Sequence, residues 1–265
     1  MQLLWKALFL AVLYFFSMAA SAALESGKPT VLITGANRGI GLEFVRQFAE
    51  RGWNVIATAR TPKKADELNA LAAENSQIVV EQLDVTDHTR IEWLAAIYKD
   101  QPIDILLSNA GITPKYASAF KRLQGVDFDM ALQSLEVNAI APLKLAQAFM
   151  DHVAASEQKK IVVISSTAGS FATSPELPMM YSYRASKAAL NMYMYTLSFE
   201  TPKKGIILTV LSPGSVRTFE VQGVKPPNMI ETNESVSKML KVIDRLTPEN
   251  NGKFLGYEAG ETLAW

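Results

Sequence analysis

The chain has 265 residues, 49% of them hydrophobic, which is enough for one large α/β domain or two small ones with a full core. Its formal net charge is zero and its Lys and Arg residues form no long cluster, which argues against a nucleic-acid partner. The lack of cysteine excludes disulfides, thiolate nucleophiles and cysteine-ligated metals. The two histidines, His88 and His152, form no metal-binding pair; we expect both on helix surfaces and predict no metal site.

Residues 1–23 differ in composition from the rest of the chain. Lys6 precedes the apolar run 7–16, and the small residues that follow include Ala20-Ser21-Ala22, which has the A-x-A form of a signal-peptidase site. We consider a cleaved secretory signal, an uncleaved membrane anchor, and a mis-assigned start with the protein beginning near Ser26. With a signal or anchor, the protein would be exported, periplasmic or membrane-associated, with membrane contact only through this segment. Otherwise it would be cytoplasmic.

A glycine-rich stretch, Thr34–Gly41, follows the apolar run 30–33 and precedes apolar residues at helical spacing. Glycines let a backbone approach a ligand closely, and the first N–H groups of the helix attract an anion. The stretch predicts a phosphate-binding turn, although its spacing, Gly-x-x-x-Gly-x-Gly, differs from the usual dinucleotide fingerprint. The alternative is a βα turn without a ligand. The candidate contacts are Gly35, Asn37, Arg38, Gly39, Ile40 and Gly41.

A second predicted strand, 53–59, ends at Arg60, and Pro62 then opens a predicted helix that reaches about Glu74. NAD-binding folds of this kind place an Asp or Glu near here to bind the ribose hydroxyls, but residues 55–60 include no carboxylate. Arg60, together with Arg38, could instead pair with a 2′-phosphate, which favours NADP(H). The alternative is that both arginines are solvated surface charges.

The third predicted strand, 78–83, ends in Asp84-Val85. Asp84 could accept a hydrogen bond from an adenine amino group, or it could cap the next helix, for which Asp87 is the better candidate. The fourth predicted strand, 103–107, ends in Ser108-Asn109-Ala110-Gly111, where small residues allow the backbone to approach a ligand.

A long helix is predicted over about 126–153, and it contains Asn138 and Pro142. Proline inside a helix frees carbonyl groups and kinks the helix. Asn138 could hold a water molecule at this kink, or it could satisfy the freed backbone groups.

The fifth predicted strand, 160–164, runs into Ser165–Ser170 and a loop over 171–180. A predicted helix from Tyr181 to about Phe199 follows. The sixth strand, 206–211, ends before Pro213-Gly214. Strands and helices alternate without a repeat or a second domain, which predicts a doubly wound parallel sheet.

Tyr183 and Lys187 are four residues apart on a predicted helix, so they share one face. A nearby ammonium would lower the pKa of the phenol, and Tyr183 could then exchange a proton with a carbonyl or alcohol oxygen. Ser166 could donate a hydrogen bond to the same oxygen. A nicotinamide would supply the hydride, because no side chain can.

These motifs resemble the classical short-chain dehydrogenase/reductase family, in chain order over nearly all of residues 28–265. The matching residues are Thr34–Gly41, Asp84-Val85, Asn109-Ala110-Gly111, Asn138, Ser166, Tyr183, Lys187 and Pro213-Gly214. Within the family, Tyr183–Asn191 and the C-terminal stretch, which includes Gly252–Tyr257 and ends at Trp265, resemble the C-factor-like and sniffer-like carbonyl reductases. The resemblance implies a single Rossmann-type domain of about seven strands with helices on both faces.

The same resemblance implies roles for individual residues. Asn138, Ser166, Tyr183 and Lys187 would form a catalytic tetrad, and Lys187 would also hold the nicotinamide ribose. Gly214 and Val216 would lie along the nicotinamide, and Thr218 would contact the amide or pyrophosphate side of the cofactor. The other implied cofactor contacts are the glycine turn, Arg60, Asp84, Val85, Asn109, Ala110, Gly111 and Pro213.

Two departures from the family pattern stand out. Ser108 replaces the usual first Asn of Asn-Asn-Ala-Gly, which we expect to be tolerated. The loop from Ser166 to Tyr183 is longer than usual and could displace Ser166 or reshape the substrate entrance. Tyr181 has no lysine partner, because Ala185 occupies the position four residues on.

The expected activity is NADP(H)-dependent interconversion of an apolar carbonyl compound and its alcohol. The apolar character is expected from residues on either side of the sixth strand: Phe171, Leu177, Met179, Met180, Phe219, Val221, Val224, Pro226, Pro227, Met229 and Ile230. The alternative is a non-catalytic, C-factor-like signalling or binding protein on the same fold. The resemblance also allows a homo-oligomer, since relatives occur as monomers, dimers and tetramers.

Overall fold

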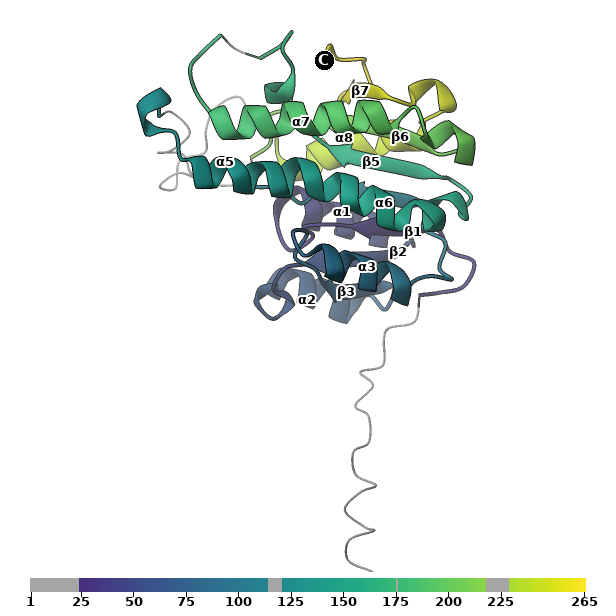
Figure 1. The fold of residues 1–265 in the computed structure, drawn as a ribbon. Helices are drawn as coiled ribbons and strands as arrows, with labels where there is room; N and C mark the ends of the chain where they lie inside the picture. Colours follow the sequence, from purple (N-terminus) through teal and green to yellow (C-terminus); the bar gives the residue numbers. More distant parts are fainter. Residues whose placement is uncertain (1–23, 114–120, 175, 218–228) are drawn as a thin grey trace, which may run out of the picture.

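The computed structural model describes residues 24–113, 121–174, 176–217 and 229–265. Its centre is a seven-stranded parallel sheet in the order β3-β2-β1-β4-β5-β6-β7 (Figure 1). The strands are β1 (Thr30–Ile33), β2 (Asn54–Ala59), β3 (Ile78–Gln82), β4 (Ile105–Ser108), β5 (Lys160–Ile164), β6 (Ile207–Ser212) and β7 (Lys253–Gly256). This arrangement confirms the predicted doubly wound parallel sheet.

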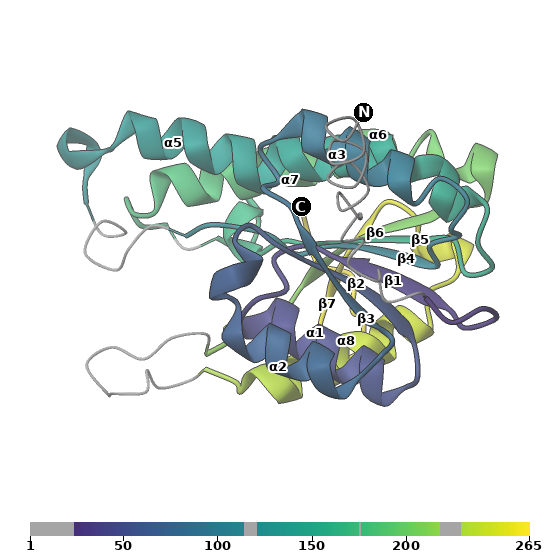
Figure 2. The ribbon, with the colours of Figure 1, turned by 90° about the horizontal axis from the view of Figure 1, so that it is seen from below.

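Helices cover both faces of the sheet, as Figure 2 shows. One face carries α1 (Gly39–Glu50), α2 (Asp66–Glu74) and α8 (Thr232–Asp244). The other face carries α3 (His88–Ile97), α5 (Phe128–Leu135), α6 (Ala141–Ala154) and α7 (Tyr181–Leu197). Successive strand residues point to opposite faces, so Val31 and Ile33 join one buried cluster and Leu32 joins the other. Because both faces are covered, the central strands are almost entirely apolar.

The order of the strands reverses beside β1, which pairs with β2 on one side and β4 on the other. All strands run the same way, so their carboxyl ends meet along one edge. Ligands of open α/β sheets bind in the crevice at such a switch point. The glycine turn after β1 and the Ser108–Gly111 segment at the end of β4 therefore lie where a ligand is expected.

The predicted helix over 126–153 is three helical segments in this structure. A π-helical turn, Glu136–Ile140, separates α5 from α6. Pro142 has no N–H to donate to the carbonyl of Asn138, and the N–H of Ala141 reaches back five residues to Glu136. The prediction of an irregularity at Asn138 and Pro142 is confirmed, but its form is a π turn within a nearly continuous rod (Figure 1).

Other predicted boundaries also differ from the structure. Pro62 opens a short 3-10 turn, Pro62–Lys64, before α2, and the sequence interpretation contained neither α8 nor β7. The expectation that His152 lies on the surface is wrong: it is 9% exposed, and its Nε2 lies 3.0 Å from the carbonyl oxygen of Ala95. His88 is half-buried at the start of α3.

No helix in the described part of the chain is both long and apolar enough to cross a membrane. The predicted signal or anchor, residues 1–23, lies outside the described residues and stays a prediction.

Candidate active site

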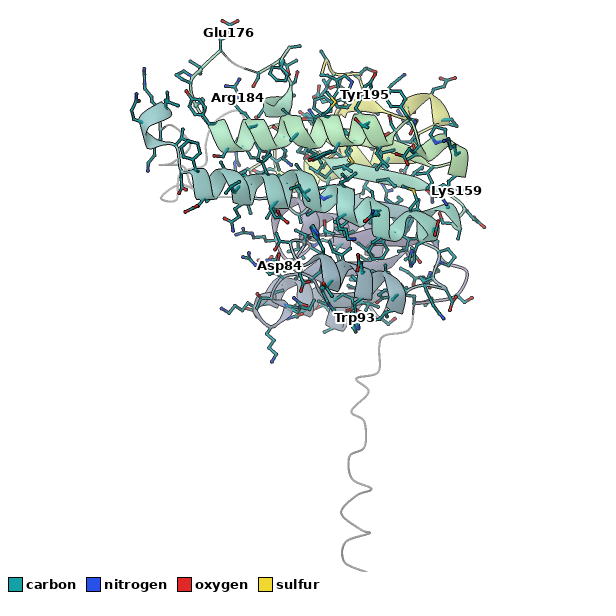
Figure 3. All side chains as sticks on the ribbon, in the orientation of Figure 1. Asp84, Trp93, Lys159, Glu176, Arg184 and Tyr195 are labelled. Atoms are coloured by element: carbon teal, nitrogen blue, oxygen red, sulfur yellow. The ribbon has the colours of Figure 1, made fainter. Side chains whose placement is uncertain are left out.

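The predicted site residues come from both halves of the sheet and meet at the carboxyl edge of the strands. Figure 3 places Asp84, which follows β3, and Arg184, at the start of α7, on one side of the molecule. Lys159, which precedes β5, lies on the opposite side. The candidate site is therefore built on the edge that the topology assigns to ligands.

The glycine turn has a backbone that only glycine adopts readily. Gly35 has φ +67° and Gly39 has φ +56°. A Cβ on Gly35 would lie 2.8 Å from Cα of Ala110, and one on Gly41 would lie 2.2 Å from the carbonyl oxygen of Gly35. The helix that begins at Gly39 has no side-chain cap and no acidic residue in its first turn. Its first N–H groups are thus left for an anion, which fits a phosphate cradle.

The segment after β4 is fastened to this turn. The Thr34 hydroxyl oxygen accepts hydrogen bonds from the N–H of Asn109 at 3.1 Å and of Ala110 at 3.0 Å. In return, Asn109 Nδ2 donates to the carbonyl oxygens of Thr34 at 2.9 Å and Gly35 at 3.2 Å. The segment thereby holds the glycine turn in shape. Ser108, the departure from the family pattern, is buried, and its hydroxyl has no partner among the described residues.

Arg38 and Arg60 are both exposed, Arg38 immediately before α1 and Arg60 immediately after β2. Neither forms an ion pair with an acidic group of the described residues. Two guanidinium groups without such partners at the rim of a phosphate cradle fit an additional phosphate group.

Asp84 and Asp87 accept different hydrogen bonds at the start of α3. Asp87 caps α3 by accepting the N–H of Arg90 at 2.9 Å, so the capping alternative for Asp84 is wrong. Asp84 Oδ1 instead accepts the N–H of Thr86 at 3.1 Å and its hydroxyl at 2.8 Å. Val85 is buried in the core beside it.

Asn138 projects from the π turn and bonds across to the chain after Gly111. Its Oδ1 accepts the N–H of Ile112 at 2.8 Å, and its Nδ2 donates to the Ile112 carbonyl oxygen at 2.9 Å. Nδ2 also donates to the hydroxyl of Ser186 on α7 at 2.9 Å. The side chain satisfies the backbone of another segment, so the prediction that it satisfies carbonyls freed in its own helix is wrong. The water-holding role stays a prediction.

Lys187 is buried, and its Nζ donates to the carbonyl oxygen of Ile164, at the end of β5, at 2.9 Å. The ammonium lies 5.9 Å from the centre of the Tyr183 ring. A Cβ on Gly111 would come within 3.9 Å of Nζ, so the segment after β4 also borders this group. Burial lowers the pKa of Lys187 to about 8, because the charged form loses hydration.

Tyr183 is half-buried one turn before Lys187. Burial raises the pKa of its phenol, and the neighbouring hydroxyl of Ser166 opposes this rise. The net pKa is thus raised and not lowered as expected, because desolvation of the phenol outweighs any effect of the Lys187 ammonium, which donates to the Ile164 carbonyl oxygen. The phenol is protonated at neutral pH.

The turn after β6 is held by residues that the sequence interpretation missed. The hydroxyl of Ser235 on α8 donates to the Pro213 carbonyl oxygen at 2.7 Å. Gly214 has φ +77°, and a Cβ there would lie 2.6 Å from the Tyr257 ring. Ser235 is the first residue on the buried face of α8. The helical spacing of apolar residues over 235–243 could have predicted this helix from the sequence.

The structure describes only part of the predicted site beyond this turn. Val216 is buried and forms a parallel bridge with Ile230. Thr218 lies outside the described residues, as do five of the residues from which an apolar substrate is expected: Phe219, Val221, Val224, Pro226 and Pro227.

Comparison with known proteins identifies the family. A model of the short chain dehydrogenase family matches residues 29–228, and the chain therefore belongs to the short-chain dehydrogenase/reductase family of oxidoreductases. An uncharacterized oxidoreductase of Schizosaccharomyces pombe is 34% identical, with 88% of this chain and 96% of the relative covered. C-signal of Myxococcus xanthus is 32% identical and covers 62% of this chain and 93% of its own.

Solved structures agree with this assignment. The NADPH-bound carbonyl reductase from chicken fatty liver is 34% identical with a TM-score of 0.79, covering 90% of this chain and 99% of its own. The carbonyl reductase Sniffer of D. melanogaster is 30% identical with a TM-score of 0.79, covering 90% of this chain and 100% of its own. The predicted resemblance to sniffer-like and C-factor-like members is confirmed.

Proposed function

We propose that this oxidoreductase is an NADP(H)-dependent carbonyl reductase that interconverts an apolar carbonyl compound and its alcohol, with Tyr183 as general acid and base. One arrangement supports the proposal above all: the Lys187 ammonium lies 5.9 Å from the Tyr183 ring and bonds to the end of β5, next to Ser166 and on the strand edge that also carries the glycine turn. The bound NADPH of the chicken carbonyl reductase supports the choice of cofactor. The proposed catalytic unit comprises residues 28–265, with residues 1–23 as a separate leader or anchor.

The residues of the first half of the sheet would hold the cofactor. The cradle of Gly35, Asn37, Gly39, Ile40 and Gly41 would take the pyrophosphate at the start of α1. Arg38 and Arg60 would pair with the 2′-phosphate, and Asp84 and Val85 would border the adenine.

The residues of the second half would hold the nicotinamide end. Asn109, Ala110 and Gly111 would lie against the cofactor where this segment borders Lys187, and Lys187 would bind the ribose. Pro213, Gly214, Val216 and Thr218 would follow the nicotinamide. When bound, the cofactor supplies the hydride that no side chain can provide.

Four side chains would carry the chemistry of the protein. Tyr183, protonated at neutral pH, gives its proton to the carbonyl oxygen as the carbonyl carbon is reduced, and it takes the proton back in the reverse direction. Ser166 donates a hydrogen bond to the same oxygen. Lys187, with a pKa of about 8, is charged at neutral pH and favours the phenolate that forms as Tyr183 loses its proton. Asn138 holds the chain at Ile112 beside Lys187.

An apolar substrate is favoured by the loop between Ser166 and Tyr183. Phe171 is 92% exposed and Leu177 is 56% exposed on this loop, while Met229 and Ile230 are half-buried after β6. Exposed apolar groups near a catalytic edge gain free energy when they cover an apolar ligand.

The alternative is that the chain is a non-catalytic signalling or binding protein. Its similarity to C-signal is the reason to consider this alternative. A pure binding protein has no need for a phenol, a hydroxyl and a buried ammonium at one point. The reductase is therefore the function that these residues support best.

A fluorescence titration with NADPH and with NADH tests the proposal. Tighter binding of NADPH, followed by oxidation of NADPH with apolar carbonyl compounds, is the expected result. Preference for NADH would overturn the assignment of Arg38 and Arg60. Binding of neither cofactor would remove the reductase function and favour the signalling alternative.

A further inference from the structure

Asn191 is a buried polar residue with no part in the chemistry proposed above. It lies one turn beyond Lys187 and two turns beyond Tyr183 on α7, so these three residues share one face of the helix. Its side chain is 4% exposed, and its Oδ1 accepts a hydrogen bond from the Ser165 hydroxyl at 2.7 Å. Its Nδ2 donates to the Gly169 carbonyl oxygen at 3.4 Å. One amide therefore holds both ends of the turn Ser165–Gly169.

Ser166 lies inside this turn, one residue beyond its first held end. The turn closes on itself, because the N–H of Gly169 donates to the Ser166 carbonyl oxygen at 2.9 Å. The N–H of Ala168 also donates to the Ser166 hydroxyl oxygen at 3.1 Å. The turn packs directly on α7: a Cβ on Gly169 would lie 2.6 Å from the carbonyl carbon of Lys187. The helix that carries Tyr183 thus also sets the position of Ser166.

We propose that Asn191 is a positioning residue that fixes the Ser166 hydroxyl against Tyr183 by tying both ends of the Ser165–Gly169 turn to α7. The catalytic consequence rests on the proposed reductase function, whereas the geometric part does not. No proton or electron passes through Asn191, so its loss changes only where Ser166 lies. A misplacement of about 1 Å can cost about 100-fold in rate.

The test replaces the hydrogen-bonded pair with an apolar one. Asn191→Leu combined with Ser165→Ala removes the amide and the hydroxyl that bonds to it together, so that this hydroxyl is not left buried without a partner. Asn54→Leu is the matched control. Asn54 is 1% exposed at the opposite end of the sheet, where it exchanges hydrogen bonds with the backbone of Glu25 at 2.9 and 2.8 Å.

For the double variant we expect kcat to fall at least about tenfold, with the affinity for NADPH unchanged. The Asn54→Leu control should keep the wild-type kcat at a comparable loss of thermal stability. Wild-type kcat in the double variant would overturn the inference. An equal loss of kcat in Asn54→Leu would also overturn it, because the effect would then follow stability and not position.

A second measurement does not depend on turnover. Fluorotyrosine placed at position 183 reports the pKa of its phenol by fluorine NMR, and Ser166 holds that pKa down. We expect the pKa to rise in Ser166→Ala and to rise equally in the Asn191→Leu, Ser165→Ala double variant. A wild-type pKa in either protein would overturn the inference. Equal rises in a protein that reduces no carbonyl compound would uphold the positioning role and contradict the proposed function.

Discussion

The two halves of the sheet bring different kinds of group to the ligand edge. The half from β1 to β3 contributes mainly backbone: two glycines with positive φ, an uncapped helix start, and two exposed arginines. The half from β4 to β7 contributes wholly or partly buried side chains that form hydrogen bonds within this half, such as Asn138 to the Ser186 hydroxyl and Lys187 to the backbone carbonyl oxygen of Ile164. Substitutions of groups that act separately should have independent, additive effects. Substitutions within one hydrogen-bond network should have effects that depend on one another.

The largest expected effect is in the second half. Replacing Tyr183 with Phe removes the proton donor but leaves the cradle and arginines intact, so turnover should fall about 1000-fold while NADPH affinity is retained. Steady-state kinetics and a binding titration check this. Tyr181→Phe is the control, because Tyr181 is 40% exposed two residues earlier and lacks a lysine partner. A Tyr183→Phe enzyme with wild-type turnover would exclude the proposed acid.

In the first half, Gly41→Ala should break cofactor binding through the backbone. Its Cβ would lie 2.2 Å from the Gly35 carbonyl oxygen and 2.6 Å from Asn109 Nδ2, so the cradle must shift. We expect the free energy of unfolding to fall by about 3 kcal/mol and NADPH affinity to fall with it. Chemical denaturation and titration measure both. In the control Gly125→Ala, the nearest atoms to the new Cβ are side-chain atoms of Lys121 at 3.1–3.3 Å, so both losses should be much smaller; an equal loss there would contradict the account.

Lys187 should make stability depend on pH. Burial holds its pKa at about 8 in the folded protein, below the 10.5 of a free lysine, so the unfolded chain binds more protons between these values. Stability should therefore rise with pH across that window. Relative to Lys187→Met, the wild type should gain about 2 kcal/mol between pH 8 and pH 10. Denaturation curves of the two proteins, measured in parallel at each pH, test this. A difference in unfolding free energy that does not change with pH would show that the ammonium is not desolvated.

The smallest expected effect belongs to the arginines. Arg38→Ala and Arg60→Ala should each weaken NADPH binding about tenfold, through loss of charge-assisted hydrogen bonds to the 2′-phosphate, and leave NADH binding unchanged. Arg46→Ala is the control, because Arg46 pairs with Glu43 on α1. An equal loss of affinity for NADPH and NADH would show that these arginines contact a part of the cofactor other than the 2′-phosphate.

The sequence predicted the elements whose signals are local. Apolar runs located the first six strands within about two residues, and the four-residue spacing of Tyr183 and Lys187 placed both on one face of a helix that forms. The glycine turn was identifiable because its function requires particular residue types at particular positions.

Features that depend on packing between distant segments were not predictable in the same way. The burial of His152 depends on α3 lying beside α6, and the partner of Asn138 is a segment 26 residues earlier in the chain. The pKa of Tyr183 rises because packing against other segments partly desolvates its phenol, which neighbouring residues in the sequence do not reveal. Asn191 extends the same helical spacing by one more turn, so its place on the face was readable but its partners were not.

The most direct test of the reductase assignment is a single-turnover experiment. Protein saturated with NADPH is mixed with a panel of apolar ketones and aldehydes, and the loss of NADPH absorbance is followed for wild type and Tyr183→Phe. We predict oxidation of NADPH by the wild type and almost none by Tyr183→Phe, which still binds the cofactor. NADPH oxidation at the same rate in both proteins, or binding without oxidation for every compound, would contradict the assignment.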